Sequence, residues 1–396
     1  MRLGIDARNV VDKNSGLVGY VRNLIFNLVK YEDLKITIFC QEQYRYIFKE
    51  IANSENIEIV TAFYSPKFLD VKNLYYEKYY FAKQVDTANL DLFHNPFGFG
   101  IPGGIKTRSI LTVHDLIPLT GSDDMTRMQL FVYKKSLSTS LRKAEQIITI
   151  SDFTKQELLK SFPSLKGKKV RTIYNGFDKL NSFKNLDEKQ LALSQEFKIN
   201  GSKYICYTGS ATKRKNLPKL VESFAKFIRE SKLDYKLFVI SKFNRPLTRK
   251  TYFEILDIGR KHDISKNLIL PDRYIDDNEK AALIYGSEFF VYPSVYEGFG
   301  LPILEAMSLG KAVACSDIGI FKEICGDSVV FFDPNKITSI SESFLQLSDS
   351  TQRKVFEKRG LARQENFSWD KMTTEYHNIY NEMIVGMNSE TQTRSE

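Results

Sequence analysis

The residues best suited to chemistry lie in the segment YPSVYEGFGLPILEA, residues 292–306. An apolar run ends at Tyr292, a turn with two glycines follows, and Pro302 suits the first position of a helix. Small residues let the backbone approach a ligand, and the N–H groups at a helix start bind phosphate. In this segment those N–H groups belong to Phe299, Gly300 and Leu301.

Two carboxylates flank the same turn, Glu297 before it and Glu305 one helical turn after it. Carboxylates repel a phosphate, but they accept hydrogen bonds well from the hydroxyl groups of a sugar or a ribose. The pattern therefore indicates a ligand that carries both phosphate and hydroxyl groups. The alternative is an ordinary strand-to-helix turn with two surface glutamates.

A second candidate is the loop YTGSATKRKN, residues 207–216, which follows an apolar run. Lys213, Arg214 and Lys215 would supply positive charge for a diphosphate. Ligands of open α/β sheets bind at the carboxyl ends of strands, so this loop would face the same site as the glutamates. The alternative is a solvated cluster of basic side chains.

His114 and Asp115 stand at the C-terminal end of the expected strand 109–114. A histidine there could contact a substrate hydroxyl or move a proton, or it could be a structural hydrogen-bonding residue. The segment NSGLVGY, residues 14–20, places a glycine turn after the first apolar run. It lacks the middle glycine of the dinucleotide-binding fingerprint, so an NAD-dependent oxidoreductase is poorly supported.

Short apolar runs alternate with helix-length amphipathic segments, which predicts parallel sheets covered on both faces. The expected strands of the first half are 2–6, 35–40, 57–60, 91–94, 109–114, 146–150 and 170–174. The pattern restarts with expected strands at 203–208, 235–241, 268–270, 288–292, 312–316 and 329–332. Helices are expected near 19–30, 42–52, 69–85, 126–143, 152–161, 216–231, 248–262, 277–285, 302–309 and 337–347.

This alternation predicts an α/β fold of two Rossmann-like, doubly wound domains that face each other across a central cleft. The first domain would span residues 1–178 and the second residues 179–367. The polar stretch 178–200 lacks strand character and would be the linker. A last helix, 368–386, would complete the first domain.

The composition and the net charge of the chain limit the kinds of molecule that the protein is expected to bind. Hydrophobic residues make up 42% and charged residues 27% of the chain, which is typical of a globular protein rather than a disordered one. The formal charge is +9, and residues 1–180 hold 26 Lys and Arg against 19 Asp and Glu. An anionic membrane or phosphorylated substrates would explain this basic half, whereas no recognition motif supports nucleic acid.

The cysteines and the first residues of the sequence indicate the cellular compartment in which we expect the protein. The four cysteines are scattered, and three follow β-branched or aromatic runs, which predicts buried thiols rather than disulfides or metal ligands. The start MRLGIDAR lacks the apolar core of a signal peptide, and no stretch approaches the ~18–20 apolar residues of a membrane span. We therefore expect a cytoplasmic protein.

Taken together, these motifs resemble those of the family 4 glycosyltransferases of the GT-B fold over nearly the whole chain. The main signature is EGFGLPILEAM at 297–307, which matches that family's pair of glutamates separated by seven residues. Further motifs in the family's order are DAR at 6–8, SGLVGY at 15–20, FHNP at 93–96, VHDLIP at 113–118, ITISDFTKQEL at 148–158, IYNGFD at 173–178, YTGSATKRKN at 207–216, SDIG at 316–319 and FSW at 367–369.

The resemblance implies a retaining transferase that uses a nucleotide-sugar donor and needs neither a metal nor another cofactor. The second domain would bind the donor and the first domain the acceptor. Lys215 would hold the diphosphate with help from Arg214, Glu297 would contact the sugar, and Glu305 would accept from the ribose hydroxyls. The backbone N–H groups would donate to the donor from Phe299, Gly300 and Leu301.

In the first domain the resemblance implies that His114 contacts the sugar and that Asp115 orients it, while Gly16 opens a loop over the phosphates. The departing phosphate would itself take the proton of the acceptor, so no protein nucleophile is needed. Cationic side chains would then stabilise the charge that develops on the leaving group.

Two positions depart from the family pattern. Many relatives carry Gly-Arg where Val18 and Gly19 stand, and others carry an arginine where Ser210 stands in the donor site. Arg214 would replace that second charge. The base of the donor would rest against the loop 271–275, which contains Arg273 and Tyr274.

The substrates follow from the resemblance less directly. GDP-mannose is the favoured donor because bacterial relatives of this type often act in O-antigen or capsule assembly, while UDP-sugars and dTDP-rhamnose stay open. The acceptor would be a saccharide, in particular a lipid-linked glycan intermediate. Alternatives are a nucleotide-sugar epimerase of the same fold and a non-catalytic partner protein that binds sugar nucleotides.

Residues 63–83 interleave Phe and Tyr with lysines, and residues 160–171 hold a second basic run. Such side chains suit an anionic bilayer, where each basic residue contributes about 1 kcal/mol. They would equally suit tyrosines that cover a core and lysines that are solvated. The membrane reading predicts peripheral binding on the inner face of the cytoplasmic membrane.

Overall fold

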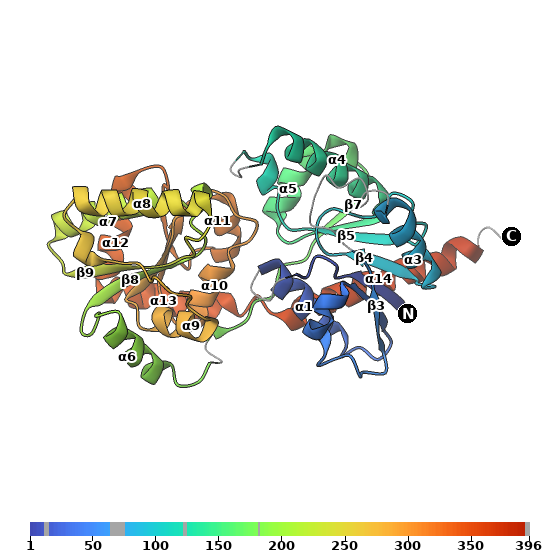
Figure 1. The fold of residues 1–396 in the computed structure, drawn as a ribbon, viewed down its shortest axis with the longest axis horizontal. Helices are drawn as coiled ribbons and strands as arrows, with labels where there is room; N and C mark the ends of the chain where they lie inside the picture. The colour runs from blue at the N-terminus through green and yellow to red at the C-terminus, as the bar shows by residue number, and fades with distance from the viewer. Residues whose placement is uncertain (12–15, 64–75, 122–124, 181–182, 393–396) are drawn as a thin grey trace. The chain divides into compact units, whose positions relative to one another are not determined.

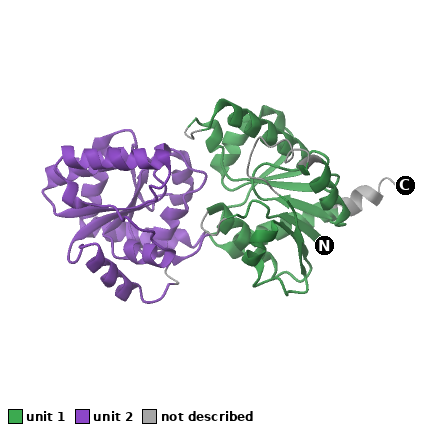
Figure 2. Ribbon diagram, viewed as in Figure 1, with its two compact units in different colours: residues 1–176, 367–396 green, residues 177–366 purple. Residues whose placement is uncertain are grey.

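The computed structural model describes residues 1–11, 16–63, 76–121, 125–180 and 183–392, without the side chains of residues 77–78 and 386–392. The chain divides into two compact units (Figure 2). Unit 1 comprises residues 1–176 and 367–396, and unit 2 comprises residues 177–366. The chain therefore contributes to unit 1 twice, with its first half and with its last helix.

Unit 1 is built on a seven-stranded parallel sheet in the order β3-β2-β1-β4-β5-β6-β7 (Figure 1). The strands are β1 (Arg2–Asp6), β2 (Lys35–Cys40), β3 (Ile57–Thr61), β4 (Leu92–Asn95), β5 (Ser109–Val113), β6 (Gln146–Thr149) and β7 (Lys169–Thr172). Each strand expected from the apolar runs of the first half is present, with small shifts at its ends.

Helices cover both faces of this sheet. They are α1 (Gly16–Leu28), α3 (Ala82–Thr87), α4 (Arg127–Lys143), α5 (Asp152–Ser161) and α14 (Trp369–Gln392), with the short turns η1 (Glu42–Phe48), η2 (Tyr76–Phe81), η3 (Ile117–Leu119) and η4 (Pro163–Leu165). Helix α5 begins where the side chain of Ser151 accepts from the N–H of Thr154. The helix expected at 42–52 is the 3₁₀ turn η1. Of the helix expected at 69–85, residues 69–75 lie outside the described residues, and the rest forms η2 and the first part of α3.

Successive side chains of a strand point to opposite faces of the sheet, so unit 1 has one hydrophobic core on each face. Ile36 and Ile38 of β2 belong to a cluster with α1 and α14, while Phe39 points into a cluster with α4 and α5. Helix α14 packs on α1, so the end of the chain closes one face of the first sheet.

Unit 2 carries a six-stranded parallel sheet in the order β10-β9-β8-β11-β12-β13. The strands are β8 (Lys203–Thr208), β9 (Tyr235–Ile240), β10 (Leu268–Ile269), β11 (Phe289–Tyr292), β12 (Val313–Ser316) and β13 (Val330–Phe332). Chain order reverses at the neighbouring strands β8 and β11, as it does at β1 and β4 in unit 1. The predicted α/β fold with two doubly wound parallel sheets is thus confirmed.

The helices of unit 2 are α6 (Leu186–Glu196), α7 (Leu217–Ser231), α8 (Pro246–Lys261), α9 (Asp277–Tyr285), α10 (Leu301–Ser308), α11 (Gly319–Cys325), α12 (Ile337–Ser348) and α13 (Ser350–Gln364). The expectation that 178–200 is only a linker is wrong, because α6 forms there and packs on α9. Helices α11 and α13 were not expected either. Helix α13 buries only Gly360 and Gln364, so its sequence has little apolar periodicity.

The cysteine prediction is confirmed, since Cys40, Cys206, Cys315 and Cys325 are all buried and unpaired. Within the described part of the chain, no helix has both the length and the apolar character needed to cross a membrane.

Candidate functional site

The two strongest sequence motifs meet at the carboxyl ends of β8 and β11, where the strand order of unit 2 reverses. Ligands of doubly wound sheets bind at such positions. The N–H of Val295 donates to the carbonyl of Arg214 at 2.8 Å, which joins the loop after β11 to the loop after β8. In the loop after β8, a short 3₁₀ helix, η6 (Lys213–Lys215), carries the basic side chains.

Glu297 is the centre of a buried ion cluster. Its Oε1 lies 2.6 Å from Nη1 of Arg214 and also accepts a hydrogen bond from Nζ of Lys215. Nζ of Lys215 also donates to the hydroxyl of Tyr292, which donates to the same Oε1 at 3.3 Å. Lys215 is 5% and Glu297 8% exposed. Because two cations face one carboxylate, this cluster carries a net positive charge that suits an anion.

Burial sets the protonation states of the cluster. It lowers the pKa of Lys215 to about 8, although the Glu297 carboxylate opposes that shift. Burial would raise the pKa of Glu297, but Lys215 and Arg214 hold that pKa below its usual range. Burial and the Glu297 charge raise the pKa of Tyr292 well above its ordinary value. At neutral pH the cluster therefore consists of one carboxylate, two cations and a neutral phenol.

Two stacked tyrosine rings lie beside the ammonium group of Lys215. The ring centroids of Tyr207 and Tyr292 are 6.1 Å apart, and Nζ of Lys215 lies 4.6 Å from the centroid of Tyr292. The Tyr207 hydroxyl donates to the carbonyl of Ser210 at 3.0 Å. A Cβ atom on Gly209 would come within 2.7 Å of that hydroxyl, so the loop needs glycine at this position. Ser210 is exposed at the outside of the loop.

The turn before α10 also depends on glycine. Gly300 has a φ of +114°, and a Cβ atom there would lie 3.0 Å from the ring of Phe321. Helix α10 begins at Leu301, one residue before the start that the sequence predicts, and Pro302 lies in its first turn. Phe299 is buried beside this helix start. The three residues whose N–H groups were expected at an anion site therefore lie at the N-terminus of a helix.

Glu305 lies on α10 and is paired with a lysine that the sequence did not point to. Its Oε1 is 3.1 Å from Nζ of Lys280, which is also 3.3 Å from Oδ1 of Asp277. Burial would lower the pKa of Lys280, but the two carboxylates outweigh burial and raise it. Glu305 keeps 18% of its side chain exposed, so it can accept a further hydrogen bond.

The guanidinium group of Arg273 forms ion pairs with two carboxylates. Its guanidinium makes hydrogen bonds of 2.6–3.0 Å with Glu196 and Glu279 and donates to the carbonyl of Tyr274 at 2.9 Å. These bonds raise the pKa of Arg273 and hold the loop in place. Tyr274 is 51% exposed, and Nζ of Lys242 lies 4.6 Å from the centroid of its ring.

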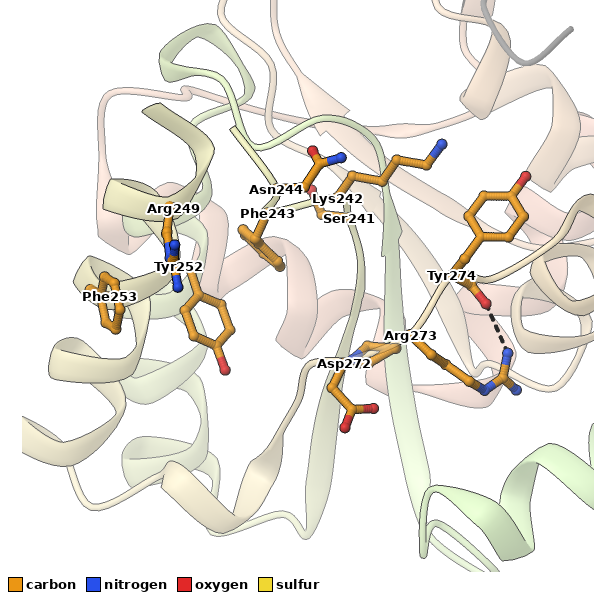
Figure 3. A pocket seen from close by; sticks show the side chains of 11 residues that line it. Ser241, Lys242, Phe243, Asn244, Arg249, Tyr252, Phe253, Asp272, Arg273 and Tyr274 are labelled. Carbon is orange, nitrogen blue, oxygen red and sulfur yellow. Dashed lines mark hydrogen bonds between the residues drawn. The ribbon is translucent and has the colours of Figure 1, made fainter. Parts of the chain in front are cut away.

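This loop borders a cavity of about 560 Å³ at the carboxyl ends of β9 and β10 (Figure 3). Aromatic side chains line one side of it, and the exposed carboxylate of Asp272 lies on another. The lining residues are Ser241, Lys242, Phe243, Asn244, Arg249, Tyr252, Phe253, Pro271, Asp272, Arg273 and Tyr274. Sequence reasoning found Arg273 and Tyr274, but it missed the side contributed by the loop after β9 and by α8.

His114 lies at the end of β5 in unit 1. Its Nε2 is 2.7 Å from the carbonyl oxygen of Pro96, and its ring packs edge-on against Tyr20 with centroids 4.6 Å apart. Burial lowers the pKa of His114 to about 4. A carbonyl only accepts, so the neutral ring carries its proton on Nε2. Asp115 accepts from the N–H of Ile117 at 3.0 Å and so holds the turn that follows.

Gly16 begins α1, and the residues before it, 12–15, lie outside the described chain. A Cβ atom at Gly16 would meet no other atom within 4 Å. In the described residues no group of three or more His, Cys, Asp or Glu side chains could hold a metal ion.

Comparison with known proteins gives matches over both units. The family model "Glycosyl transferases group 1" matches residues 189–363, and "Glycosyltransferase Family 4" matches residues 14–179. O-antigen chain mannosyltransferase B of Escherichia coli is 31% identical over 294 residues, which cover 73% of this chain and 74% of that protein. O-antigen chain mannosyltransferase RfbU of Salmonella typhimurium is 24% identical over 252 residues, or 61% of this chain and 62% of that protein.

Two solved structures share the fold at low identity. Sucrose-phosphate synthase from Thermosynechococcus elongatus has a TM-score of 0.75 at 17% identity, covering 98% of this chain and 100% of that one. Anabaena Alr3699/HepE in complex with UDP and glucose has a TM-score of 0.73 at 14% identity, covering 96% and 100%. Together with the family matches, these findings show that the chain belongs to the family 4 glycosyltransferases of the GT-B fold and is a hexosyltransferase.

Proposed function

We propose that the protein is a retaining transferase that moves mannose from GDP-mannose to a lipid-linked saccharide in the synthesis of a bacterial surface polysaccharide. The observation that carries the proposal is the buried cluster of Arg214, Lys215 and Glu297 at the carboxyl ends of β8 and β11. The names of the relatives, which are mannosyltransferases of O-antigen chains, support the sugar and the pathway.

The donor diphosphate binds to Lys215 and Arg214. Both cations now contact Glu297, and a phosphate group would compete with that carboxylate for them. The carboxylate is then available to accept a hydrogen bond from a hydroxyl of the sugar. As the bond from the anomeric carbon to the phosphate oxygen breaks, the two cations stabilise the growing negative charge.

The nucleoside binds farther along the same sheet edge. Glu305 accepts from the ribose hydroxyls with its exposed side, while Lys280 holds its other side. The base enters the cavity beside Tyr274, where aromatic side chains provide surfaces for stacking. The cavity is large enough for a purine, which agrees with a guanine nucleotide as donor.

The acceptor belongs to unit 1 in this proposal. His114 is neutral, so its Nδ1 accepts a hydrogen bond from a substrate hydroxyl rather than serving as a cationic acid. A phosphate oxygen of the departing nucleoside diphosphate takes the proton of the acceptor hydroxyl while the new C–O bond forms on the same face. This front-face displacement needs no metal and no protein nucleophile.

Contact with an anionic membrane is the last part of the proposal. In the second basic run, Lys160, Lys166 and Lys169 are exposed, whereas Lys168 bonds to two carbonyls and Arg171 pairs with Glu382. Three aromatic residues are exposed as well, namely Tyr79 at 51%, Tyr80 at 60% and Phe131 at 62%. Of the first basic segment, Lys67 and Lys72 lie outside the described residues.

A donor panel tests the function without knowledge of the acceptor. GDP-mannose, UDP-glucose, UDP-N-acetylglucosamine and dTDP-rhamnose are compared by thermal shift and by slow donor hydrolysis. We expect GDP-mannose to stabilise the protein most and to release α-mannose first, as seen by NMR. Release of the β anomer would refute retention, and release of an altered sugar nucleotide would identify an epimerase. No stabilisation by any donor would refute the proposal.

A further inference from the structure

A continuous chain of buried hydrogen bonds runs through unit 1 from helix α14 toward His114. The hydroxyl of Tyr376 on α14 lies 2.6 Å from the hydroxyl of Tyr20 on α1 and 2.8 Å from Oγ1 of Thr112 on β5. Tyr376 is fully buried, and Tyr20 is 2% exposed. Side-chain hydroxyls therefore join helix α14 to β5, the strand that ends next to His114.

The same network of hydrogen bonds continues on the other side of Thr112. Its Oγ1 is 2.8 Å from Nε2 of His94, and Nδ1 of His94 is 2.8 Å from the hydroxyl of Tyr380, one helical turn beyond Tyr376. Burial lowers the pKa of His94 to about 3, so this histidine is neutral as well. Tyr20, Tyr376, Thr112, His94 and Tyr380 each have a hydrogen-bond partner in this network. A buried polar network whose members are all partnered fixes orientation instead of destabilising the core.

Tyr20 connects this network to His114. Its ring stands at 87° to the imidazole of His114, with the centroids 4.6 Å apart. On another side the Pro96 carbonyl accepts from Nε2, while Nδ1 has no hydrogen-bond partner among the residues that the structure describes. Two contacts therefore set the plane of the imidazole, and the remaining nitrogen is the one that can accept from a ligand.

We propose that Tyr376 and Tyr20 are positioning residues, through which helix α14 holds the imidazole of His114 with Nδ1 directed at a substrate hydroxyl. The proposal rests on the proposed contact between His114 and substrate. Phenylalanine would fill nearly the same volume at both positions. The hydroxyls are what tie the Tyr20 ring to Thr112 of β5, the strand that ends at Val113, directly before His114.

The test compares two tyrosine hydroxyls, each of which joins α14 to another part of unit 1. Tyr376→Phe removes the bonds to Tyr20 and Thr112, whereas the control Tyr31→Phe removes the 3.0 Å bond to Oγ1 of Thr374, also on α14. Each variant is studied as the full chain for kcat, for donor KM, and for the ¹⁵N signals of the His114 ring. His114→Ala is measured in parallel.

We expect Tyr376→Phe to lower kcat about tenfold, less than the ~100-fold cost of a misplacement of about 1 Å, with donor KM unchanged. The His114 ring signals should shift in Tyr376→Phe and stay unchanged in Tyr31→Phe. Equal losses in the two variants would show that only helix docking matters and would overturn the proposal, as would unchanged ring signals. If His114→Ala leaves kcat unchanged, the proposed contact between His114 and the substrate is wrong, and the positioning role of the two tyrosines fails with it.

Discussion

Nη1 of Arg214 lies 2.6 Å from Oε1 of Glu297, the same oxygen that Lys215 contacts. A single buried carboxylate oxygen thus holds two cations from the loop after β8. This arrangement keeps both cations desolvated and oriented before a ligand arrives, so a diphosphate would meet charges that need little reorganisation. Removal of Glu297 would leave the buried ammonium group of Lys215 without its carboxylate.

Lys215→Ala should lower kcat about 10²–10³-fold, because one of the two charges that stabilise the leaving diphosphate is lost. The matched control is Lys213→Ala, which removes an exposed lysine from the same short helix η6. The measurement is steady-state transfer or donor hydrolysis, with thermal unfolding to confirm that both variants fold. Equal activity of the two variants would contradict the role of Lys215.

Local patterns made much of this site predictable. The strand ending at Tyr292, the glycine turn and Pro302 fix where α10 starts, and the structure has that start at Leu301. Because β8 and β11 are neighbours in a parallel sheet, the loops that follow them lie at the same edge. Sequence order alone could not show that Glu297 would bind Lys215 and Arg214 through a single oxygen, because that depends on rotamers.

Other features had no local signal. Helix α6 is largely polar and gains its place by packing on α9, which no pattern within 178–200 reveals. Lys280 stands on α9 and meets Glu305 of α10 only after both helices have packed on the sheet. The hydroxyl pair of Tyr20 and Tyr376 joins residues 356 positions apart, a contact that depends entirely on the return of α14 to unit 1.

Glu305→Gln should raise the donor Kd about tenfold, since exchanging a charged acceptor for a neutral one costs roughly 1.4 kcal/mol. The ion pair with Lys280 is weakened at the same time. Glu342→Gln on the exposed face of α12 is the control and should leave the Kd unchanged. Titration calorimetry with the nucleoside diphosphate measures both. An unchanged Kd in Glu305→Gln would remove the carboxylate from the binding site.

Gly300→Ala should lower the free energy of unfolding of unit 2 by about 1–3 kcal/mol, because an alanine would have to adopt a positive φ. The new Cβ would also press on the ring of Phe321 at 3.0 Å. Gly19→Ala inside α1 is the control, as its Cβ would meet nothing within 4 Å. Urea unfolding measures the two variants, and a stable Gly300→Ala protein would contradict the strain argument.

Activity should fall as pH rises through about 8, because Lys215 loses its proton there and one positive charge leaves the diphosphate site. The same deprotonation does not destabilise the fold. Between about 8 and the ordinary 10.5 the unfolded chain binds more protons at this lysine than the folded protein does, so its contribution to stability rises with pH. His114, with a pKa of about 4, stays neutral throughout this range. The expected result is therefore an alkaline loss of kcat without a matching loss of thermal stability.

Lys215→Arg identifies the titrating group, because arginine keeps its charge far above pH 8. The alkaline limb of the kcat profile should move upward in this variant even if its maximal rate is lower. The control is Lys213→Arg, which changes an exposed lysine and should leave the limb near 8. If the limb stays in place in Lys215→Arg, another group governs it, and the assignment of the lowered pKa of Lys215 to catalysis is wrong.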